Sequence, residues 1–221
     1  MLEAVLFDWG NTLVHLEWED NLVAAGHRAA LGRDDPEFTA RWRELLLNGA
    51  RDRPYEEILA ELGVEDPDTF IDREHEVWRP QYAVLASARA LLESLRDRGL
   101  KTGLVANSWP DPSRVLRADA EALGLAPLLD VLVFSADAGV RKPDAAIFLR
   151  ACSDLAVDPA AVLFVGDDPV NDVQGAANVG MTTAQALWFK ASETAGIEPD
   201  FQAFTAMDVL NIAARLARFP Q

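Results

Sequence analysis

The sequence predicts an α/β protein in which a doubly wound parallel sheet forms the main domain and a small all-helical domain is inserted after the first strand. A short apolar run, Val5–Phe7, has the composition of a buried strand. A helical pattern then occupies residues 16–85, and strands alternate with helices from residue 86 to residue 221. Such alternation is typical of a parallel sheet that helices cover on both faces.

The inserted domain shows the apolar spacing of amphipathic helices. Phe38, Trp42, Leu45 and Leu46, for example, fall on one face of a single expected helix. Prolines stand near the ends of these segments, as they do at many helix boundaries. The expected helices span residues 21–31, 36–47, 55–62 and 70–78. We therefore assign residues 16–85 to a helical domain, and residues 1–15 and 86–221 to the sheet domain.

Strand and helix patterns alternate regularly in the second part of the chain. Glycines follow three of the expected helices, where a left-handed residue commonly ends a helix. The expected strands span residues 102–106, 131–134, 162–165 and 183–187. The expected helices span residues 88–98, 112–123, 145–156, 172–179 and 206–219.

The chain is strongly acidic. It contains 20 Lys and Arg against 36 Asp and Glu, a formal net charge of −16. Nucleic acid and anionic membranes are therefore not expected as partners.

Cys152 is the only cysteine, which excludes a disulfide within the chain. No basic leader and no membrane-spanning apolar segment is evident, so we expect a cytoplasmic protein.

Polar residues follow four of the expected strands. The carboxyl ends of parallel strands meet at one edge of a sheet, so these segments should converge. Clustered carboxylates repel one another unless a cation lies among them. Oxygen ligands without a Cys or His cluster favour Mg²⁺. The four segments are Asp8 to Thr12, Ala106 to Ser108, Arg141 to Pro143, and Gly166 to Asp168 with Asp172.

Three of these segments resemble motifs of the haloacid dehalogenase (HAD) superfamily. Residues 5–13, Val-Leu-Phe-Asp-Trp-Gly-Asn-Thr-Leu, are similar to its first motif, a strand followed by Asp-x-Asp-x-Thr. Residues 139–144 resemble the third motif, and residues 165–172 resemble the fourth. The helical insertion is similar to the small cap domain of one large subgroup. The resemblance covers residues 1–14 and 86–187, and it implies a Rossmann-like core with a cap.

The resemblance also implies a mechanism. Asp8 would attack the phosphorus of a small phosphorylated substrate and form an aspartyl-phosphate, which water then hydrolyses. Lys142 would neutralise charge on Asp8 and on the transferring group. Asn107 and Ser108, together with Lys142, would bind the phosphoryl oxygens. The sequence therefore favours a phosphatase.

The metal site implied by the resemblance holds Mg²⁺. Its ligands would be Asp8, the backbone carbonyl of Gly10, and a further carboxylate from either Asp167 or Asp168. Two more residues would support these ligands without binding the metal themselves: Thr12 and Asp172.

Two positions depart from the phosphatase motifs. A second Asp usually stands two residues after the nucleophile and transfers protons to and from the reacting oxygens, but here that position is Gly10. The enzyme could favour aryl or acyl phosphates, whose leaving groups need little protonation, or His15 could act as the acid. Ala106 stands where the second motif usually carries Ser or Thr, and the two polar residues after it could donate hydrogen bonds instead.

The sequence leaves other functions open. Asp8 could serve a 2-haloacid dehalogenase, or the losses at Gly10 and Ala106 could mark a binding protein without catalysis. Carbon–phosphorus cleavage through a Schiff base is disfavoured because the cap has no lysine. The sequence indicates neither the physiological substrate nor the oligomeric state. Four cap arginines could contact an anionic substrate: Arg41, Arg43, Arg51 and Arg53.

Overall fold

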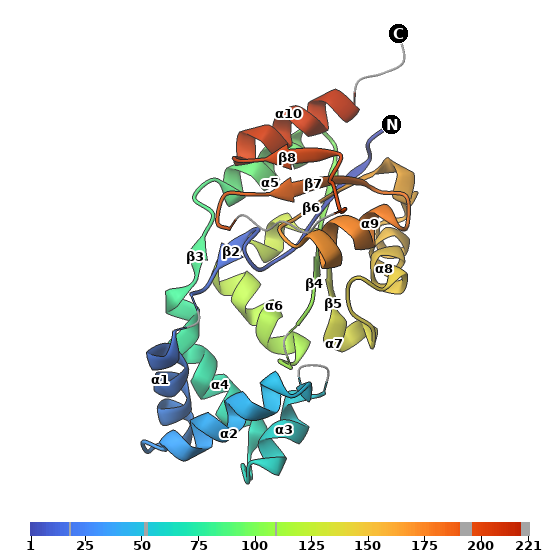
Figure 1. Cartoon of the computed structure of the whole chain (residues 1–221). Helices are drawn as coiled ribbons and strands as arrows, with labels where there is room; N and C mark the ends of the chain where they lie inside the picture. The colour runs from blue at the N-terminus through green and yellow to red at the C-terminus, as the bar shows by residue number, and fades with distance from the viewer. Residues whose placement is uncertain (18, 51–52, 109, 191–195, 218–221) are drawn as a thin grey trace. The chain divides into compact units, whose positions relative to one another are not determined.

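The computed structural model describes residues 1–221 except 18, 51–52, 109, 191–195 and 218–221 (Figure 1). The chain forms two compact units. The first, here called the core unit, contains Met1–His15, Ala83–Asn107 and Ala120–Gln221. The second, here called the cap unit, contains Leu16–Tyr82 and Ser108–Asp119.

The core unit is built on a six-stranded sheet whose neighbouring strands are all parallel. The strand order is β5-β4-β1-β6-β7-β8, with β1 in the interior. Phe7, at the end of β1, is level with Leu104 on one neighbour and Val165 on the other. The strands are β1 Ala4–Phe7, β4 Lys101–Ala106, β5 Val131–Phe134, β6 Val162–Gly166, β7 Thr182–Ala186 and β8 Phe201–Ala203. The α/β fold class is confirmed.

Helices cover the sheet on both faces, as the alternating pattern predicts. Ala4 and Leu6 of β1 belong to a cluster with buried residues of α8 (Ala145–Leu155) and α9 (Gly175–Ala177). Side chains alternate along a strand, so the residues between them point to the opposite face. Two helices that pack against each other, α5 and α10, lie apart from α8 and α9 (Figure 1). Their bounds are α5 Ala88–Asp97 and α10 Ala206–Leu216.

The cap unit is helical and has its own apolar core. Its centre contains Trp42, Ile58 and Phe70. Asp35 and Asp66 cap two of its helices by accepting hydrogen bonds from backbone N–H groups of the first turn. The helices are α1 Asp20–Leu31, α2 Pro36–Leu47, α3 Tyr55–Glu61 and α4 Pro67–Trp78, with the short turn η2 Arg79–Gln81 and the first part of α6 (Ser113–Ala122).

A chain of buried polar side chains crosses the core of the cap unit. The Trp42 indole N–H donates to the Tyr55 hydroxyl at 2.8 Å, and that hydroxyl donates to Glu74 Oε2 at 2.9 Å. The other oxygen of Glu74 lies 3.2 Å from Nε2 of His27. Burial, reinforced by the charge of Asp111, raises the pKa of Glu74 well above its usual range.

Residues 108–119 belong to the cap unit, although the sequence analysis assigned them to the sheet domain. Ion pairs explain this grouping. His75 of α4 lies 3.3 Å from a carboxylate oxygen of Asp111 and 3.4 Å from one of Asp119. Arg79 Nε donates to Asp119 Oδ1 at 2.6 Å. A buried carboxylate must keep such partners, so these contacts hold the segment against α4.

Four local features differ from the sequence prediction. The helix expected at 172–179 is a wide π turn followed by the three-residue α9, because Asp168 caps the turn earlier by accepting from two backbone N–H groups. The strand β8 was not expected, since three residues carry almost no periodicity. A short antiparallel pair and a single helical turn were also missed: β2 Val14–His15, β3 Ala83–Val84 and α7 Ser135–Ala138.

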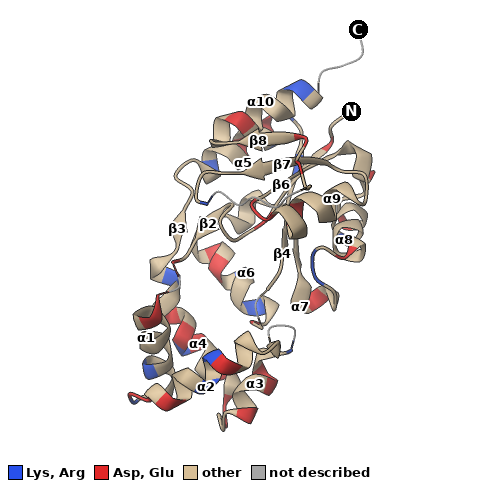
Figure 2. Ribbon diagram, viewed as in Figure 1, with Lys and Arg blue, Asp and Glu red and all other residues tan. Residues whose placement is uncertain are grey.

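Acidic residues are distributed over both units, with fewer basic ones among them (Figure 2). None of the helices in the described part of the chain has the length and apolar character needed to cross a bilayer.

Candidate active site

Three buried carboxylates meet at the carboxyl ends of the central strands. Asp8 follows β1 directly, and its backbone N–H donates to the carbonyl of Val165 in β6 at 2.9 Å. Asp167 directly follows β6, and Asp172 lies in the next turn. One oxygen from each of the three carboxylates lies within 4.8 Å of the others. This is where the topology of a parallel α/β sheet places a functional site.

Lys142 is the cation of this cluster. Its ammonium group donates to Asp8 Oδ1 at 2.5 Å and to Asp172 Oδ1 at 2.6 Å. Asn107, which follows β4, holds the backbone of Lys142 through two hydrogen bonds. The Asn107 Nδ2 donates to the Lys142 carbonyl at 3.0 Å, and the Lys142 N–H donates to Asn107 Oδ1 at 2.8 Å. Asn107 therefore positions the buried lysine from a neighbouring strand.

Asp172 is fixed through both of its oxygens. Oδ1 binds Lys142, and Oδ2 accepts from the backbone N–H of Asp168 at 3.0 Å. Gly166 makes this approach possible, because a Cβ at that position would collide with the Asp172 carboxyl group. The side chain of Asp168 instead accepts from the N–H groups of Val170 and Asn171, both at 2.8 Å. Of the two adjacent aspartates, Asp167 is the one that joins the cluster.

The electrostatics of the cluster favour a bound cation. Burial, with the charge of Asp167, raises the pKa of Asp8 in spite of Lys142. Burial and the charge of Asp172 raise the pKa of Asp167 to about 6. Burial also raises the pKa of Asp172. For Lys142, burial acts to lower the pKa, but Asp172 and Asp8 outweigh it and raise the pKa above its usual range.

The donor set fits a hard divalent cation. Three carboxylates and one ammonium group leave two negative charges in a buried site. Oxygen donors without sulfur or imidazole suit Mg²⁺ better than softer metals. Gly10 keeps its carbonyl as a further oxygen. Apart from Gly10 and its two chain neighbours, no heavy atom of the described residues lies within 4 Å of where its Cβ would stand.

The loop after Asp8 adds contacts that the sequence analysis did not assign. Asn11 Nδ2 donates to Asp167 Oδ2 at 3.2 Å, and Asn11 Oδ1 lies 2.8 Å from His15 Nδ1. Asn11 has a φ of 54°, a left-handed conformation that Asn tolerates better than most residues. Gln185 Nε2 donates to the carbonyl of Asp167 at 3.1 Å. The only sequence signal for a role of Asn11 is its position inside the first motif, between Asp8 and Thr12.

Thr12 lies beside Asp8 as expected, whereas Ser108 falls in the cap unit. Thr12 is fully buried, and its hydroxyl lies 3.5 Å from Asp8 Oδ2, the limit of a hydrogen bond. Its carbonyl accepts from the Trp188 indole at 2.8 Å. Ser108 is buried and falls in the cap unit, since the division between the units lies directly after Asn107. The role of Ser108 in phosphate binding stays a prediction.

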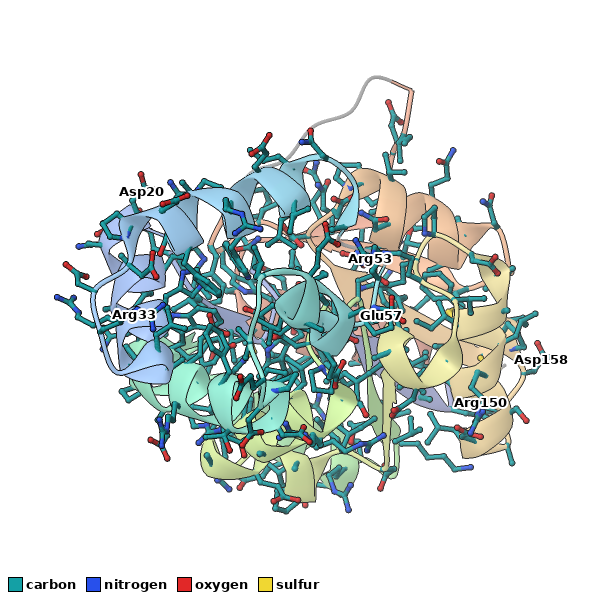
Figure 3. All side chains as sticks on the ribbon, turned by 90° about the horizontal axis from the view of Figure 1, so that it is seen from below. Asp20, Arg33, Arg53, Glu57, Arg150 and Asp158 are labelled. Carbon is teal, nitrogen blue, oxygen red and sulfur yellow. The ribbon has the colours of Figure 1, made fainter. Side chains whose placement is uncertain are left out.

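Two of the four cap arginines proposed as substrate contacts form ion pairs with acidic side chains of the cap unit. Arg43 pairs with Asp20 at 2.8 Å. Arg53 lies 2.9 Å from Glu61 and 3.9 Å from Glu57, whose labelled side chain can be followed in Figure 3. Arg41 is exposed. Arg51 lies outside the described residues.

The sequence matches a known family over most of its length. The profile of haloacid dehalogenase-like hydrolases matches residues 2–180. The chain is 32% identical over 195 residues to an N-acetylmuramic acid 6-phosphate phosphatase of Pseudomonas aeruginosa. That alignment covers 83% of this chain and 80% of the relative. The chain therefore belongs to the haloacid dehalogenase-like hydrolase family, and the resemblance predicted from the motifs is confirmed.

Solved structures agree with this fold. A HAD phosphatase from Thermococcus onnurineus superposes with a TM-score of 0.75 at 25% identity, covering 96% of this chain and 97% of that one. A 2-haloacid dehalogenase from Pseudomonas syringae pv. Tomato DC3000 gives 0.73 at 24% identity, covering 98% and 100%. Because the identity to the dehalogenase is only 24%, this likeness supports the fold alone.

Proposed function

We propose that this hydrolase is a Mg²⁺-dependent phosphatase of small phosphorylated metabolites, with Asp8 as its covalent nucleophile. The observation that carries the proposal is the buried pairing of Lys142 with Asp8 inside a cluster of three carboxylates. A binding protein without catalysis has no use for carboxylates brought together against their repulsion. The matched P. aeruginosa relative, which is named for action on a phosphorylated sugar, supports a phosphate ester as substrate.

Each residue of the core site then has a distinct role. The Asp8 carboxylate attacks phosphorus, forming a P–O bond as the bond to the leaving oxygen breaks. Lys142 favours the ionised form of Asp8 against the effect of burial and presents positive charge to the transferring group. Asp172 and Asn107 hold Lys142 in place through the side chain and the backbone. A water molecule afterwards hydrolyses the aspartyl-phosphate and restores Asp8.

The proposed metal ligands are Asp8, Asp167 and the carbonyl of Gly10. When bound, Mg²⁺ would offset the repulsion between the carboxylates and an incoming phosphate. Asn11 orients Asp167 by donating to Oδ2, and Gln185 fixes its backbone carbonyl. Asp168 is not included, because its side chain caps the following turn.

The test is phosphate release from an aryl phosphate with Mg²⁺ and with a chelator. We expect turnover that requires Mg²⁺ and that disappears in Asp8→Asn. Asp97→Asn, an exposed aspartate of α5, is the matched control and should keep wild-type activity. Halide release from a 2-haloacid, without phosphate release from a panel of phosphate esters, would instead establish dehalogenation by Asp8.

A further inference from the structure

Gly10 leaves the proposed phosphatase without its usual proton donor. Transfer of a phosphoryl group from an alkyl ester releases an alkoxide, which needs a proton as it departs. Glycine has no side chain to supply one. The place where a side chain at position 10 would begin is open among the described residues. A donor must therefore come from another part of the site.

His15 is connected to the carboxylate cluster through Asn11. Asp167, when ionised, can only accept hydrogen bonds, so Asn11 must turn its Nδ2 toward it. The Asn11 carbonyl oxygen then faces Nδ1 of His15 at 2.8 Å. A carbonyl oxygen can only accept, so Nδ1 carries the hydrogen. In the neutral ring Nε2 is consequently the nitrogen with the free electron pair.

The His15 ring is held in one orientation. It stacks on Phe189 with 5.3 Å between ring centroids and an interplanar angle of 18°. Its backbone lies in β2, level with Ala83 of β3. The side chain is partly exposed, and in the part of the chain that the structure describes Nε2 has no hydrogen-bond partner. The ring is thus fixed through Nδ1 and by stacking, and Nε2 has no partner among the described residues.

We propose that Nε2 of His15 performs the proton transfers that Gly10 cannot, an inference that rests on the proposed phosphatase function. In the first step Asp8 bonds to phosphorus, the P–O bond to the leaving group breaks, and the leaving oxygen takes the proton of Nε2. In the second step neutral Nε2 takes a proton from water, the oxygen of that water bonds to phosphorus, and the P–O bond to Asp8 breaks. Over the full cycle Nε2 gives one proton to the leaving oxygen and regains one from water, and each P–O bond that forms is matched by one that breaks.

Replacing His15 by Asn separates proton transfer by Nε2 from the positioning of Asn11 through Nδ1. Asn in place of His15 keeps an amide N–H near the position of Nδ1, so it can still donate to Asn11, but it has no titratable nitrogen. We expect His15→Asn to lower kcat/KM, which reports the step in which the leaving group departs, by about 10²–10⁴-fold on an alkyl phosphate such as glycerol phosphate. On p-nitrophenyl phosphate, whose leaving group needs little protonation, kcat/KM should change little, whereas kcat falls wherever the attack of water on the aspartyl-phosphate limits turnover. His15→Gln, a second variant, should give the same split.

Each other outcome overturns the inference. Equal losses of kcat/KM on both substrates would show that His15 only positions Asn11 and Asp167. No loss on either substrate, or a wild type that hydrolyses aryl but not alkyl phosphates, would show that His15 supplies no proton. A wild type inactive on both substrates would instead refute the proposed function itself.

Discussion

Lys142 is the residue on which the charge balance of the site depends. Lys142→Met should abolish turnover and destabilise the metal-free protein by about 3–5 kcal/mol, because Asp8 and Asp172 lose their buried partner. Urea unfolding in the presence of a chelator measures this loss. Lys190→Met, at an exposed lysine, is the control and should stay within about 0.5 kcal/mol of wild type. A stable Lys142→Met variant would mean that the carboxylates are not held by this ammonium group.

Asp167 and Asp168 are neighbours with different tasks, and their alanine variants should differ accordingly. Asp168→Ala removes the cap of the π turn and should cost about 1 kcal/mol while leaving Mg²⁺ binding intact. Asp167→Ala should remove most of the stabilisation that saturating Mg²⁺ gives, about 2.7 kcal/mol at 100 times Kd. Unfolding without Mg²⁺ measures the stability that Asp168→Ala loses. The rise in Tm on adding Mg²⁺ measures metal binding in both variants. The reverse pattern would assign the metal to Asp168.

At the scale of elements, the ion pairs of His75 make the cap unit sensitive to alkaline pH. Burial alone would lower the pKa of His75, but Asp111 and Asp119 outweigh it and raise the pKa to about 10. The folded unit thus binds a proton that the unfolded chain releases above about 6.5. This contribution is complete below pH 6.5 and is lost as pH rises toward 10.

The expected result is a fall in unfolding free energy between pH 7 and pH 10 that is steeper in wild type than in His75→Gln. Chemical unfolding followed by the tryptophan fluorescence of the cap unit measures it. Identical pH dependences of the two proteins would show that His75 is neutral in the folded state.

The strand ends were the best predicted elements of the site. The sequence predicted that four side chains converge, because parallel strands bring their carboxyl ends together, and the structure places these four side chains in one cluster: Asp8, Lys142, Asp167 and Asp172. Their catalytic and metal-binding roles stay predictions. Motif spacing could not show that Asp168 caps a turn, since both aspartates follow the same strand. It also gave no role to Asn11, whose contact with Asp167 spans 156 positions of the chain.

At the scale of the whole molecule, the alternating pattern predicts the parallel sheet except its edge strand β8, but it does not predict how the chain divides. Residues 108–119 follow a strand of the core unit, so sequence order favours that unit. Their grouping with the cap unit instead reflects pairs such as Arg79–Asp119, 40 positions apart. Such long-range ion pairs leave no periodic signal in the sequence.

The net charge of −16 should also affect the stability of the whole chain. Like charges repel more in the folded state than in the expanded chain, and salt screens them. Raising NaCl from low concentration to about 0.15 M, with a chelator present, should therefore raise Tm. A gain of about 1 kcal/mol corresponds to roughly 2–4 °C for a chain of this size. A fall in Tm would show that attractive ion pairs dominate.

In the proposed mechanism, Asp8 carries the phosphoryl group during turnover. The most direct measurement is peptide mass analysis of enzyme quenched in acid within milliseconds of mixing with an aryl phosphate and Mg²⁺. We predict one phosphoryl group, located on the peptide that contains Asp8 and absent from Asp8→Asn. Full turnover with no phosphorylated peptide at any quench time, or with the group on another residue, would contradict the mechanism.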